Sequence, residues 1–189
     1  MSIAAVIVAA GASSRLGEPK QLVRLGNETL LERTVRVARD AGCSPIIVVL
    51  GSDYLQILTG CSLGDVVTVI NDQWQEGMGS SIRWGVHACK NVAGKVDGAV
   101  ILTCDQPAVT AEHLMRLMLK NEIKASRYAA RNGVPAFFPN KHFDALMALK
   151  GDAGARELLK DARYEELANG ELDVDTSDDL ERARELFEQ

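Results

Sequence analysis

The segment Ile3-Ala4-Ala5-Val6-Ile7-Val8-Ala9-Ala10 decides the fold class of this chain, because it is a run of eight apolar residues that ends at Gly11. A continuous apolar run of this length, bounded by glycine, is typical of a strand buried on both faces of a parallel sheet. The run is too short for a membrane-spanning helix, which needs about 20 apolar residues. We therefore expect a first β-strand with helices packed on both sides of it.

Working outward from this strand, short apolar runs alternate with helical stripes. The stretch Thr29–Asp40 repeats apolar residues at helical spacing, and Gly42 follows it as a stop signal. The same kinds of pattern predict strands at 46–50, 66–70 and 99–102, a helix at 81–90, and a helix with Thr110 as its cap.

The pattern is weaker after residue 120. Two short strands are expected at 128–130 and 136–138, around a turn at Asn132–Pro135. Helices are expected near 141–149 and 155–160, then a short strand Leu172–Asp175 and a last helix that ends at Phe187. Because 189 residues make about one domain, we expect a single domain over residues 1–189.

This alternation predicts an α/β fold: one three-layer α/β/α, Rossmann-like domain with a mostly parallel central sheet. In such sheets, ligands bind outside the carboxyl ends of the strands. Functional residues are therefore expected in the loops that follow Ala10, Ile70, Leu102 and Val174.

The composition is that of a globular protein, since 47% of the residues are hydrophobic and 25% are charged. These values exclude a disordered, collagen-like or coiled-coil chain. The 21 basic and 26 acidic side chains give a net charge of −5, which argues against nucleic acid or an anionic membrane as the main partner. The first 42 residues are basic on balance and the last 39 are acidic, so phosphates would suit the former and a metal ion the latter, although solvated helix faces explain most of those acids.

Cysteine and histidine offer little support for a metal centre. The four cysteines form no C-x-x-C pair and have no histidine cluster nearby, so no zinc site is expected. Nothing basic precedes Ile3, so we expect no export signal and a cytoplasmic protein with reduced thiols. The three histidines fall inside expected helices and are interpreted as structural: His87, His113 and His142.

The loop from Gly11 to Lys20 carries the first chemical signal. A small-residue loop after a buried strand exposes backbone N–H groups that can hold phosphate, and Arg15 and Lys20 add two cations. The loop is neither a Walker A motif nor a G-x-G-x-x-G motif, so NAD binding has no support. The alternative is an ordinary turn with solvated cations.

Two carboxylates follow strand ends. Asp105 lies just beyond the strand at 99–102, and Asp175 ends the strand expected at 172–175. Together they could hold Mg²⁺, which takes one or two carboxylates plus substrate phosphates. The alternatives are a local turn for Asp105 and a helix cap for Asp175. Asp173 would point to the opposite face of a regular strand, so it is the poorer candidate.

A fourth loop, Gly77–Ile82, combines two glycines with two hydroxyls before a helix. It could bring backbone close to a ligand, or it could be a flexible loop with an N-cap serine.

Taken together, these motifs resemble a known family. Ala9-Ala10-Gly11-x-Ser13-x-Arg15-Leu16-Gly17 with Pro19-Lys20 resembles the signature loop of the nucleoside-triphosphate transferase superfamily. Within that superfamily, the later motifs are similar to those of the molybdenum cofactor cytidylyltransferase family (MobA-like). These motifs appear in order along the chain: Gly77-Met78-Gly79-Ser80-Ser81-Ile82, Cys104-Asp105-Gln106-Pro107, Gly133-x-Pro135, Gly151-Asp152-x-Gly154-Ala155-Arg156 and Asp173-x-Asp175-Thr176.

The resemblance implies a role for each matching residue. It implies that Arg15, Lys20 and Asp105 are catalytic and that Asp105 and Asp175 hold Mg²⁺, or Mn²⁺ in its place. The implied nucleotide-binding residues are Ala9, Ala10, Gly11, Ala12, Ser13, Arg15, Lys20, Gly79, Ser80, Ser81 and Asp105. The implied second-substrate residues are Gly133, Pro135, Gly151, Asp152, Gly154 and Arg156.

The function implied is transfer of CMP from CTP to the terminal phosphate of molybdopterin, with release of pyrophosphate. Guanylyl-transferring relatives usually have Gly where this chain has Ala10, which favours a pyrimidine nucleotide, although sugar-phosphate relatives also carry Ala-Ala-Gly. Expected partners are CTP, molybdopterin and, transiently, a molybdoenzyme chaperone; no nucleic acid or membrane is expected. Two alternatives stay open: a related nucleotidyltransferase that uses GTP or a sugar phosphate, and a nucleotide-binding accessory module without turnover.

Overall fold

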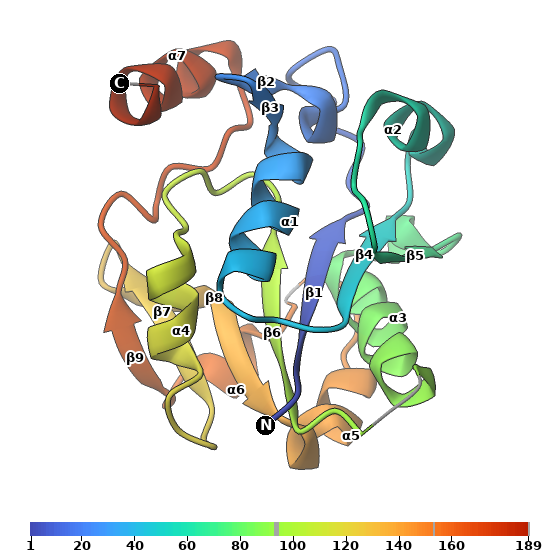
Figure 1. Ribbon diagram of the computed structural model, residues 1–189, viewed down its shortest axis with the longest axis vertical. Coiled ribbons are helices and arrows are strands. Elements are labelled where there is room, and N and C mark those ends of the chain that lie inside the picture. Colours follow the sequence, from blue (N-terminus) through green and yellow to red (C-terminus); the bar gives the residue numbers. More distant parts are fainter. Residues whose placement is uncertain (93–94, 153, 189) are drawn as a thin grey trace.

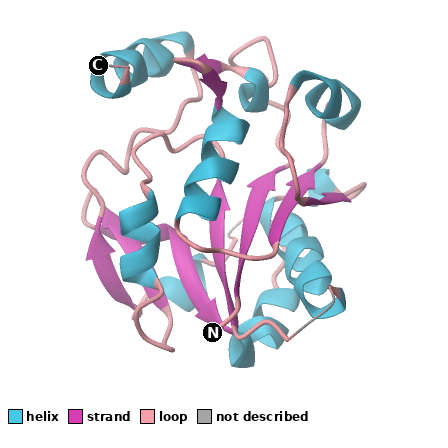
Figure 2. Cartoon of the chain, in the orientation of Figure 1, coloured by secondary structure: helices cyan, strands magenta, loops and turns pink. Residues whose placement is uncertain are grey.

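The computed structural model describes residues 1–92, 95–152 and 154–188, and its centre is a seven-stranded sheet (Figures 1 and 2). The strand order is β5-β4-β1-β6-β8-β7-β9. The strands are β1 (Ile3–Ala9), β4 (Ile46–Leu50), β5 (Val67–Ile70), β6 (Gly98–Thr103), β7 (Lys124–Tyr128), β8 (Arg131–Pro139) and β9 (Arg163–Glu166). The expected α/β fold with a mostly parallel sheet is confirmed: β8 alone among these strands runs antiparallel to its neighbours.

Helices cover both faces of the sheet, as the apolar runs predicted. One face carries α1 (Leu30–Asp40), α2 (Tyr54–Gly60) and α4 (Ala111–Leu117), and the other carries α3 (Met78–Asn91), α5 (Phe143–Met147) and α6 (Arg156–Leu159). Successive residues of β1 serve the two layers in turn: Ala5 and Ile7 pack in the α1 layer, and Ala4 and Val6 pack in the α3 layer. Burial on both faces explains why the run in β1 is apolar without alternation.

The C-terminal helix α7 (Ser177–Phe187) lies apart from the two main layers (Figure 1). It packs on the small hairpin formed by β2 (Arg24–Leu25) and β3 (Glu28–Thr29) through a separate apolar cluster. That cluster comprises Val23, Leu25, Leu30, Leu172, Val174 and Ala183. Three 3₁₀ turns complete the described elements: η1 (Lys20–Leu22), η2 (Trp74–Glu76) and η3 (Asn140–His142).

Two expectations for the second half of the chain are wrong. The hairpin turns at Ala129 and Ala130, both at positive φ, and the segment 132–135 lies inside β8 instead of in a turn. The segment Leu172–Asp175 forms no strand; a hydrogen bond from Val174 N–H to Asp105 O, 2.8 Å long, holds it beside the end of β6. The sheet ends instead with β9, which pairs parallel with β7.

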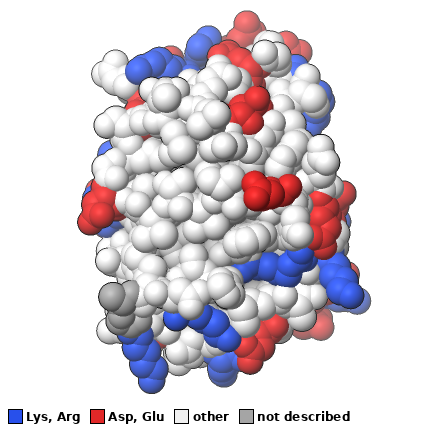
Figure 3. Space-filling model, turned by 90° about the vertical axis from the view of Figure 1, so that its right-hand side faces the viewer, with Lys and Arg blue, Asp and Glu red and all other residues white. Residues whose placement is uncertain are grey.

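The side of the molecule formed around α2, β5 and α3 is largely uncharged, although acidic side chains stand near its middle, and its Lys and Arg side chains lie mainly toward the edges (Figure 3). Leu55, Leu58 and Val67 are exposed on these elements. No helix within the described residues is both long and apolar enough to cross a membrane.

Candidate functional site

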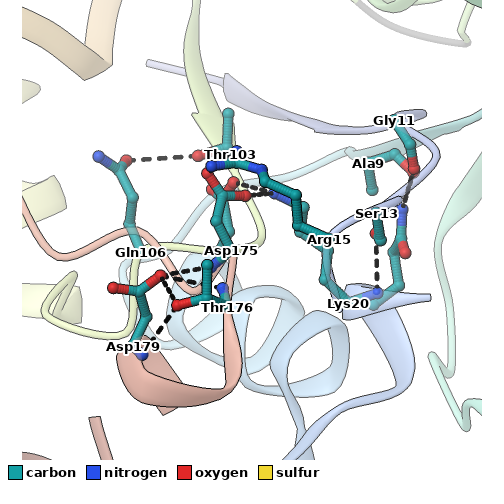
Figure 4. Close-up of polar contacts among 12 residues, drawn as sticks. Ala9, Gly11, Ser13, Arg15, Lys20, Thr103, Gln106, Asp175, Thr176 and Asp179 are labelled. Atoms are coloured by element: carbon teal, nitrogen blue, oxygen red, sulfur yellow. Dashed lines mark hydrogen bonds and ion pairs between the residues drawn. The ribbon is translucent and has the colours of Figure 1, made fainter. Parts of the chain in front are cut away.

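The loop after β1 is shaped by hydrogen bonds to its own backbone. Ser13, at a φ of 45°, accepts a hydrogen bond from the Lys20 N–H at its Oγ, 2.9 Å away, and this bond closes the loop on itself (Figure 4). Gln21 is buried, and its Nε2 donates to Ala9 O at 2.7 Å and to Gly11 O at 3.3 Å. These bonds fix the start of η1, so the Lys20 side chain is directed toward the end of β6.

Lys20 is the centre of an ion cluster at the carboxyl ends of the strands. Its Nζ donates to Asp105 Oδ2 at 2.7 Å and to Asp175 Oδ1 at 2.6 Å. Arg15 reaches the other oxygen of Asp175, with Nη2 2.7 Å from Oδ2 (Figure 4). The four residues that the sequence singled out as catalytic or metal-binding therefore lie together, with the Lys20 ammonium between the two carboxylates.

The two carboxylates meet because two separate segments converge. Thr103 ends β6 and pairs with Val8 of β1, so Asp105 emerges beside the loop that follows β1. The bond from Val174 N–H to Asp105 O brings the C-terminal segment alongside. Asp175 is then held by the start of α7, where Thr176 and Asp179 form a capping box.

The charged groups of the cluster shift one another's pKa values. Burial opposes the charged form of Lys20, but the charge of Asp105 and the hydrogen bonds that Lys20 donates to Asp105 and Asp175 outweigh it and hold its pKa above the ordinary value. For Asp175, burial acts upward, yet hydrogen bonds and charges from Lys20 and Arg15 lower its pKa. Burial, then the charges of Asp105 and Asp175, raises the pKa of Asp173 to about 6.

The donor set fits a hard divalent cation. Asp105 and Asp175 direct carboxylate oxygens at one point, where the Lys20 ammonium lies 2.7 and 2.6 Å from them. No group of three or more His, Cys, Asp or Glu side chains that could hold a metal ion occurs in the described part of the chain. Two protein carboxylates, with phosphate and water as the other ligands, is the arrangement that Mg²⁺ takes with nucleotide substrates.

A pocket of about 320 Å³, here called the loop pocket, lies on one side of this cluster. Its walls come from the loop after β1, from η2 and the start of α3, and from the residues that follow β6. They include Ala9, Ala10, Gly11, Lys20, Gln21, Trp74, Gly77, Met78, Ser81, Thr103, Asp105 and Asp152.

A second pocket of about 200 Å³, here called the hairpin pocket, lies on the other side of Asp105. It is formed mainly by the β7–β8 hairpin, α6 and the C-terminal segment, and it includes Gln106, Tyr128, Arg131, Asn132, Gly133, Val134, Ala155, Arg156, Leu159 and Asp173. The two pockets share Met78, Thr103, Asp105 and Asp152. A molecule bound in each pocket would therefore meet the other at Asp105.

Several residues that the family resemblance implied do not line either pocket. Ser80 is fully buried, and its hydroxyl donates to Gln73 O or Gly77 O and accepts a hydrogen bond from Asn71. These bonds hold the start of α3 in place, and the Ser80 side chain does not face the loop pocket. Of the Gly77–Ile82 loop, Ser81 reaches the loop pocket. Six more residues lie outside both linings: Arg15, Gly79, Pro135, Gly151, Gly154 and Asp175. Ala12 and Ser13 line a separate shallow hollow on the outer side of the loop.

Gly79 and Gly151 have a structural use, because the Gly79 N–H donates to Gly151 O at 2.9 Å and this bond ties the two loops together. A Cβ on Gly79 would lie 2.9 Å from the same oxygen, closer than side chains normally approach. The residue between Asp152 and Gly154 lies outside the described residues. None of the three histidines lines either pocket.

Sequence reasoning missed several pocket residues. Gln21 follows directly after Pro19-Lys20 and could have been included with that motif, but Trp74 and Tyr128 carry no local signal. Asp173 was placed on the wrong face because the strand assumed for 172–175 does not form.

Comparison with curated proteins finds relatives along nearly the whole chain. Nicotine blue oxidoreductase of Paenarthrobacter nicotinovorans is 28% identical over 98% of this chain and 95% of its own length. Purine catabolism protein PucB of Bacillus subtilis is 27% identical over 95% and 94%. A probable molybdenum cofactor guanylyltransferase of Opitutus terrae is 30% identical over 58% of this chain and 51% of its own.

Several solved structures are also similar to this chain. Rv0371c from Mycobacterium tuberculosis superposes with a TM-score of 0.83 at 33% identity, covering 97% of both chains. A manganese complex of Rv0371c gives 0.78 at 31% identity, covering 98% of this chain and 99% of that one. The family model for the MobA-like NTP transferase domain matches residues 5–168, which contain the loop from Gly11 to Lys20, Asp105 and most of both pockets. The chain therefore belongs to the MobA-like NTP transferase family.

Proposed function

We propose that this protein transfers CMP from CTP to the terminal phosphate of molybdopterin and releases pyrophosphate. The observation that carries the proposal is the junction of two pockets at Asp105, beside a lysine that is directed at the same point. A transferase needs a donor and an acceptor that approach each other at one charged centre, and this arrangement provides it. The loop pocket would hold CTP, and the hairpin pocket would hold the acceptor.

Catalysis of this reaction requires correct positioning of the two substrates and stabilisation of negative charge. An ionised phosphate of the acceptor attacks the α-phosphorus of CTP in line, a new P–O bond forms, and the bond to pyrophosphate breaks. The attacking phosphate is already ionised at neutral pH, so no general base is needed. The protein contributes by orienting the two substrates and by neutralising negative charge as it moves to the leaving group.

Lys20 and Arg15 supply that neutralisation in the proposed mechanism. Both are cations of the phosphate loop, and both now contact Asp175. Asp105 and Asp175 would hold Mg²⁺ or Mn²⁺, which would supply charge stabilisation at the α-phosphate. The manganese found with Rv0371c, a family member at 31% identity, supports a divalent metal in this branch. In this role the protein would act in the cytoplasm and hand its product to a molybdoenzyme chaperone.

The choice of CTP rests on Ala10, whose methyl group takes up the space of one carbon in the loop pocket that glycine would leave open. The related alternatives are GTP as the nucleotide and a sugar phosphate as the acceptor, and a third is nucleotide binding without turnover. The relative described as a guanylyltransferase keeps GTP as the main competitor for this site.

A nucleotide panel tests the proposal. The protein is incubated with molybdopterin, Mg²⁺ and each of CTP, GTP, ATP and UTP, and the product is identified by mass while pyrophosphate is measured. We expect a cytosine dinucleotide of the pterin and an equal amount of pyrophosphate from CTP. The Asp105→Asn variant, which keeps the side-chain shape, should lose at least about 10²–10³ in rate.

Each other outcome has a defined meaning. A guanine dinucleotide as main product overturns the choice of CTP and keeps the reaction class. Nucleotide binding with no pyrophosphate from any nucleotide overturns the transferase assignment for this acceptor.

A further inference from the structure

The two edges of the seven-stranded sheet are protected unequally. At one edge, three of the four residues of β9 are charged: Arg163, Glu165 and Glu166. Charged side chains on an edge strand discourage pairing with another chain. At the other edge, β5 (Val67–Ile70) contains no charged residue and no proline. Nothing in the sequence of β5 therefore opposes pairing with a further strand.

The surroundings of β5 are also short of charge. Residues 54–71, which include α2 and β5, contain one charged side chain, that of Asp65, in a chain of which 25% is charged. Leu55 and Leu58 of α2 are 66% and 41% exposed, and Val67 of β5 is 37% exposed. These elements lie together on the right-hand side of Figure 1, which is the largely uncharged side in Figure 3. Exposed apolar residues next to an open strand edge are typical of an interaction surface.

The backbone of β5 presents hydrogen-bonding groups to this open edge. Among the described strands, β4 is the one neighbour of β5. The Asn71 N–H donates to Leu50 O at 2.8 Å, in the direction of β4. Because successive residues of a strand turn their backbone groups to opposite sides, Thr68 and Ile70 turn theirs to the open edge. An antiparallel strand can bond to these groups while β5 stays paired with β4.

The charges at the two ends of β5 fit a second copy of this chain. Arg39 of α1 is exposed and lies near the start of β5, where its Nη2 donates to Leu63 O at 3.3 Å. Asp72, which is also exposed, follows the end of β5. Neither side chain has an ion pair within the part of the chain that the structure describes. In an antiparallel pair the start of one strand meets the end of the other, so Arg39 of each copy is brought toward Asp72 of the other copy.

We propose that two copies of this chain pair through β5, antiparallel and about a two-fold axis that passes beside Thr68. This centre alone pairs every residue of the apolar run Val66–Ile70 with another residue of the same run. Thr68 of the two copies exchange backbone hydrogen bonds, and Val67 meets Val69 of the other copy in a non-hydrogen-bonded pair, where side chains are closest. The contact is self-complementary, and it joins the two seven-stranded sheets into one. The proposal is independent of the proposed function.

Thr68→Pro tests the pairing directly. Proline removes the N–H that crosses the two-fold axis, and an edge strand tolerates proline where its N–H faces outward. The mass of the full chain, without nucleotide, is measured by light scattering or sedimentation over about 1–100 μM protein. We expect wild type to reach twice the chain mass of 20.4 kDa at the upper concentrations and Thr68→Pro to keep the single-chain mass throughout.

A second variant covers the case in which Thr68→Pro does not fold. Val67 is exposed in the single chain, so Val67→Lys leaves the core unchanged. In the pair, however, the lysine would face Val69 of the other copy and lose its water. We therefore expect Val67→Lys to keep the single-chain mass as well, and circular dichroism shows that the variant is folded.

The matched control is Tyr164→Pro on the opposite edge of the sheet. The Leu167 N–H donates to Arg127 O at 2.9 Å, so by the same alternation the Tyr164 N–H faces away from β7. This variant loses an outward N–H from β9, and it should form dimers as wild type does.

A charge exchange tests the orientation of the two copies. Arg39→Asp removes both ion pairs of the dimer and should weaken association at least about fivefold, as expected for two exposed pairs. Asp72→Arg in the same chain should restore association, because the two charges are then exchanged. Failure of the second substitution to restore it refutes the antiparallel arrangement about Thr68.

The other outcomes are equally decisive. A single-chain mass for wild type at about 100 μM overturns the proposal, because a stable interface between copies would be populated at that concentration. A dimer that both Thr68→Pro and Val67→Lys leave intact overturns it too. A dimer that Tyr164→Pro abolishes and Thr68→Pro keeps moves the interface to β9, and an open series of larger species excludes closed two-fold pairing.

Discussion

Replacing Lys20 by methionine tests whether its ammonium occupies the place of a metal ion. The side chain is 15% exposed, and its partners Asp105 and Asp175 are 17% and 28% exposed. Lys20→Met keeps most of the apolar stem and removes the charge. The two carboxylates then face each other without a cation between them. We expect the variant to be less stable than wild type when no metal is present.

The expected loss follows from the burial of the three groups. Removing one partner of a fully buried ion pair costs about 3–5 kcal/mol, whereas an exposed pair contributes about 0–1 kcal/mol. The Lys20 cluster lies between these limits, so we expect about 2 kcal/mol. For a chain of this size, that loss lowers the melting temperature by about 4–8 °C.

Manganese should restore the lost stability. In wild-type protein a divalent cation must displace the ammonium from Asp105 and Asp175, whereas in the variant Asp105 has lost its ion pair and Asp175 keeps only the one with Arg15. Ligand-linked stabilisation grows with affinity, so the rise in melting temperature with MnCl₂ should be larger in Lys20→Met than in wild type. Thermal melts over a MnCl₂ series measure both quantities, and turnover is not needed.

The matched control is Lys90→Met, which breaks an ion pair of similar length on the surface. Lys90 Nζ lies 2.8 Å from Asp144 Oδ1, with side chains 44% and 86% exposed. This variant should stay within about 0.5 kcal/mol of wild type and show no extra response to manganese. Equal melting temperatures for Lys20→Met and wild type, or equal manganese shifts, would show that the ammonium does not stand in for a metal.

Three further predictions address specificity, pH and packing. Ala10→Gly should raise the kcat/KM ratio of GTP to CTP by about tenfold, as one methyl group allows, and an unchanged ratio removes Ala10 from base selection. Burial, with a smaller contribution from Arg116, lowers the pKa of His113 to about 4, so its neutral form stabilises the fold above pH 6.5 and that stability is lost as pH falls toward 4. Between pH 6.5 and 4.5, urea denaturation should show wild type losing about 2–3 kcal/mol more than His113→Gln, and parallel curves would contradict this. Gly85→Ala places a methyl group against the Val6 side chain and should cost about 1–3 kcal/mol of unfolding free energy, whereas equal urea midpoints would show that the helix can shift.

The strands that the sequence predicted well are those buried on both faces. The runs in β1, β4 and β6 are apolar throughout, and only a parallel strand between two helix layers requires that. The edge strand β9, Arg163-Tyr164-Glu165-Glu166, shows no apolar run, because it is mostly exposed and is held by pairing with β7. Because its residues are mostly polar, the sequence alone did not indicate a strand there.

The hairpin turn was misplaced for a related reason. Asn132-Gly133 is a strong turn signal, yet the chain reverses at Ala129–Ala130, two residues that rarely adopt positive φ. Gly133 instead lies under the Tyr128 ring, whose hydroxyl and ring atoms fill the space that a Cβ would need. Tertiary packing, which no local pattern records, therefore outweighed the turn preference.

The sequence predicted those residues of the candidate site that directly follow a buried strand. Asp105 lies just after β6, which ends at Thr103, and it contacts Lys20 at the end of the loop that follows β1, as its place at a strand end predicted. Asp175 was placed with the right partners for the wrong reason, because a single backbone bond and an apolar cluster position it instead of a strand. The roles of the pocket residues in catalysis and binding remain predictions for the experiments above.

The position of Asp175 also determines when the site can first exist. Lys20 and Asp175 are 155 residues apart, and Arg15 and Asp175 are 160 apart. At synthesis rates of about 5–20 residues per second, the phosphate loop leaves the ribosome on the order of 10–30 s before its carboxylate partner. Every strand of the sheet precedes Asp175 in the chain, so a growing polypeptide can assemble the sheet while the ion cluster around Lys20 is still incomplete. The contacts of Lys20 and Arg15 with Asp175 can therefore form only after the segment carrying Asp175 has been synthesised and has docked.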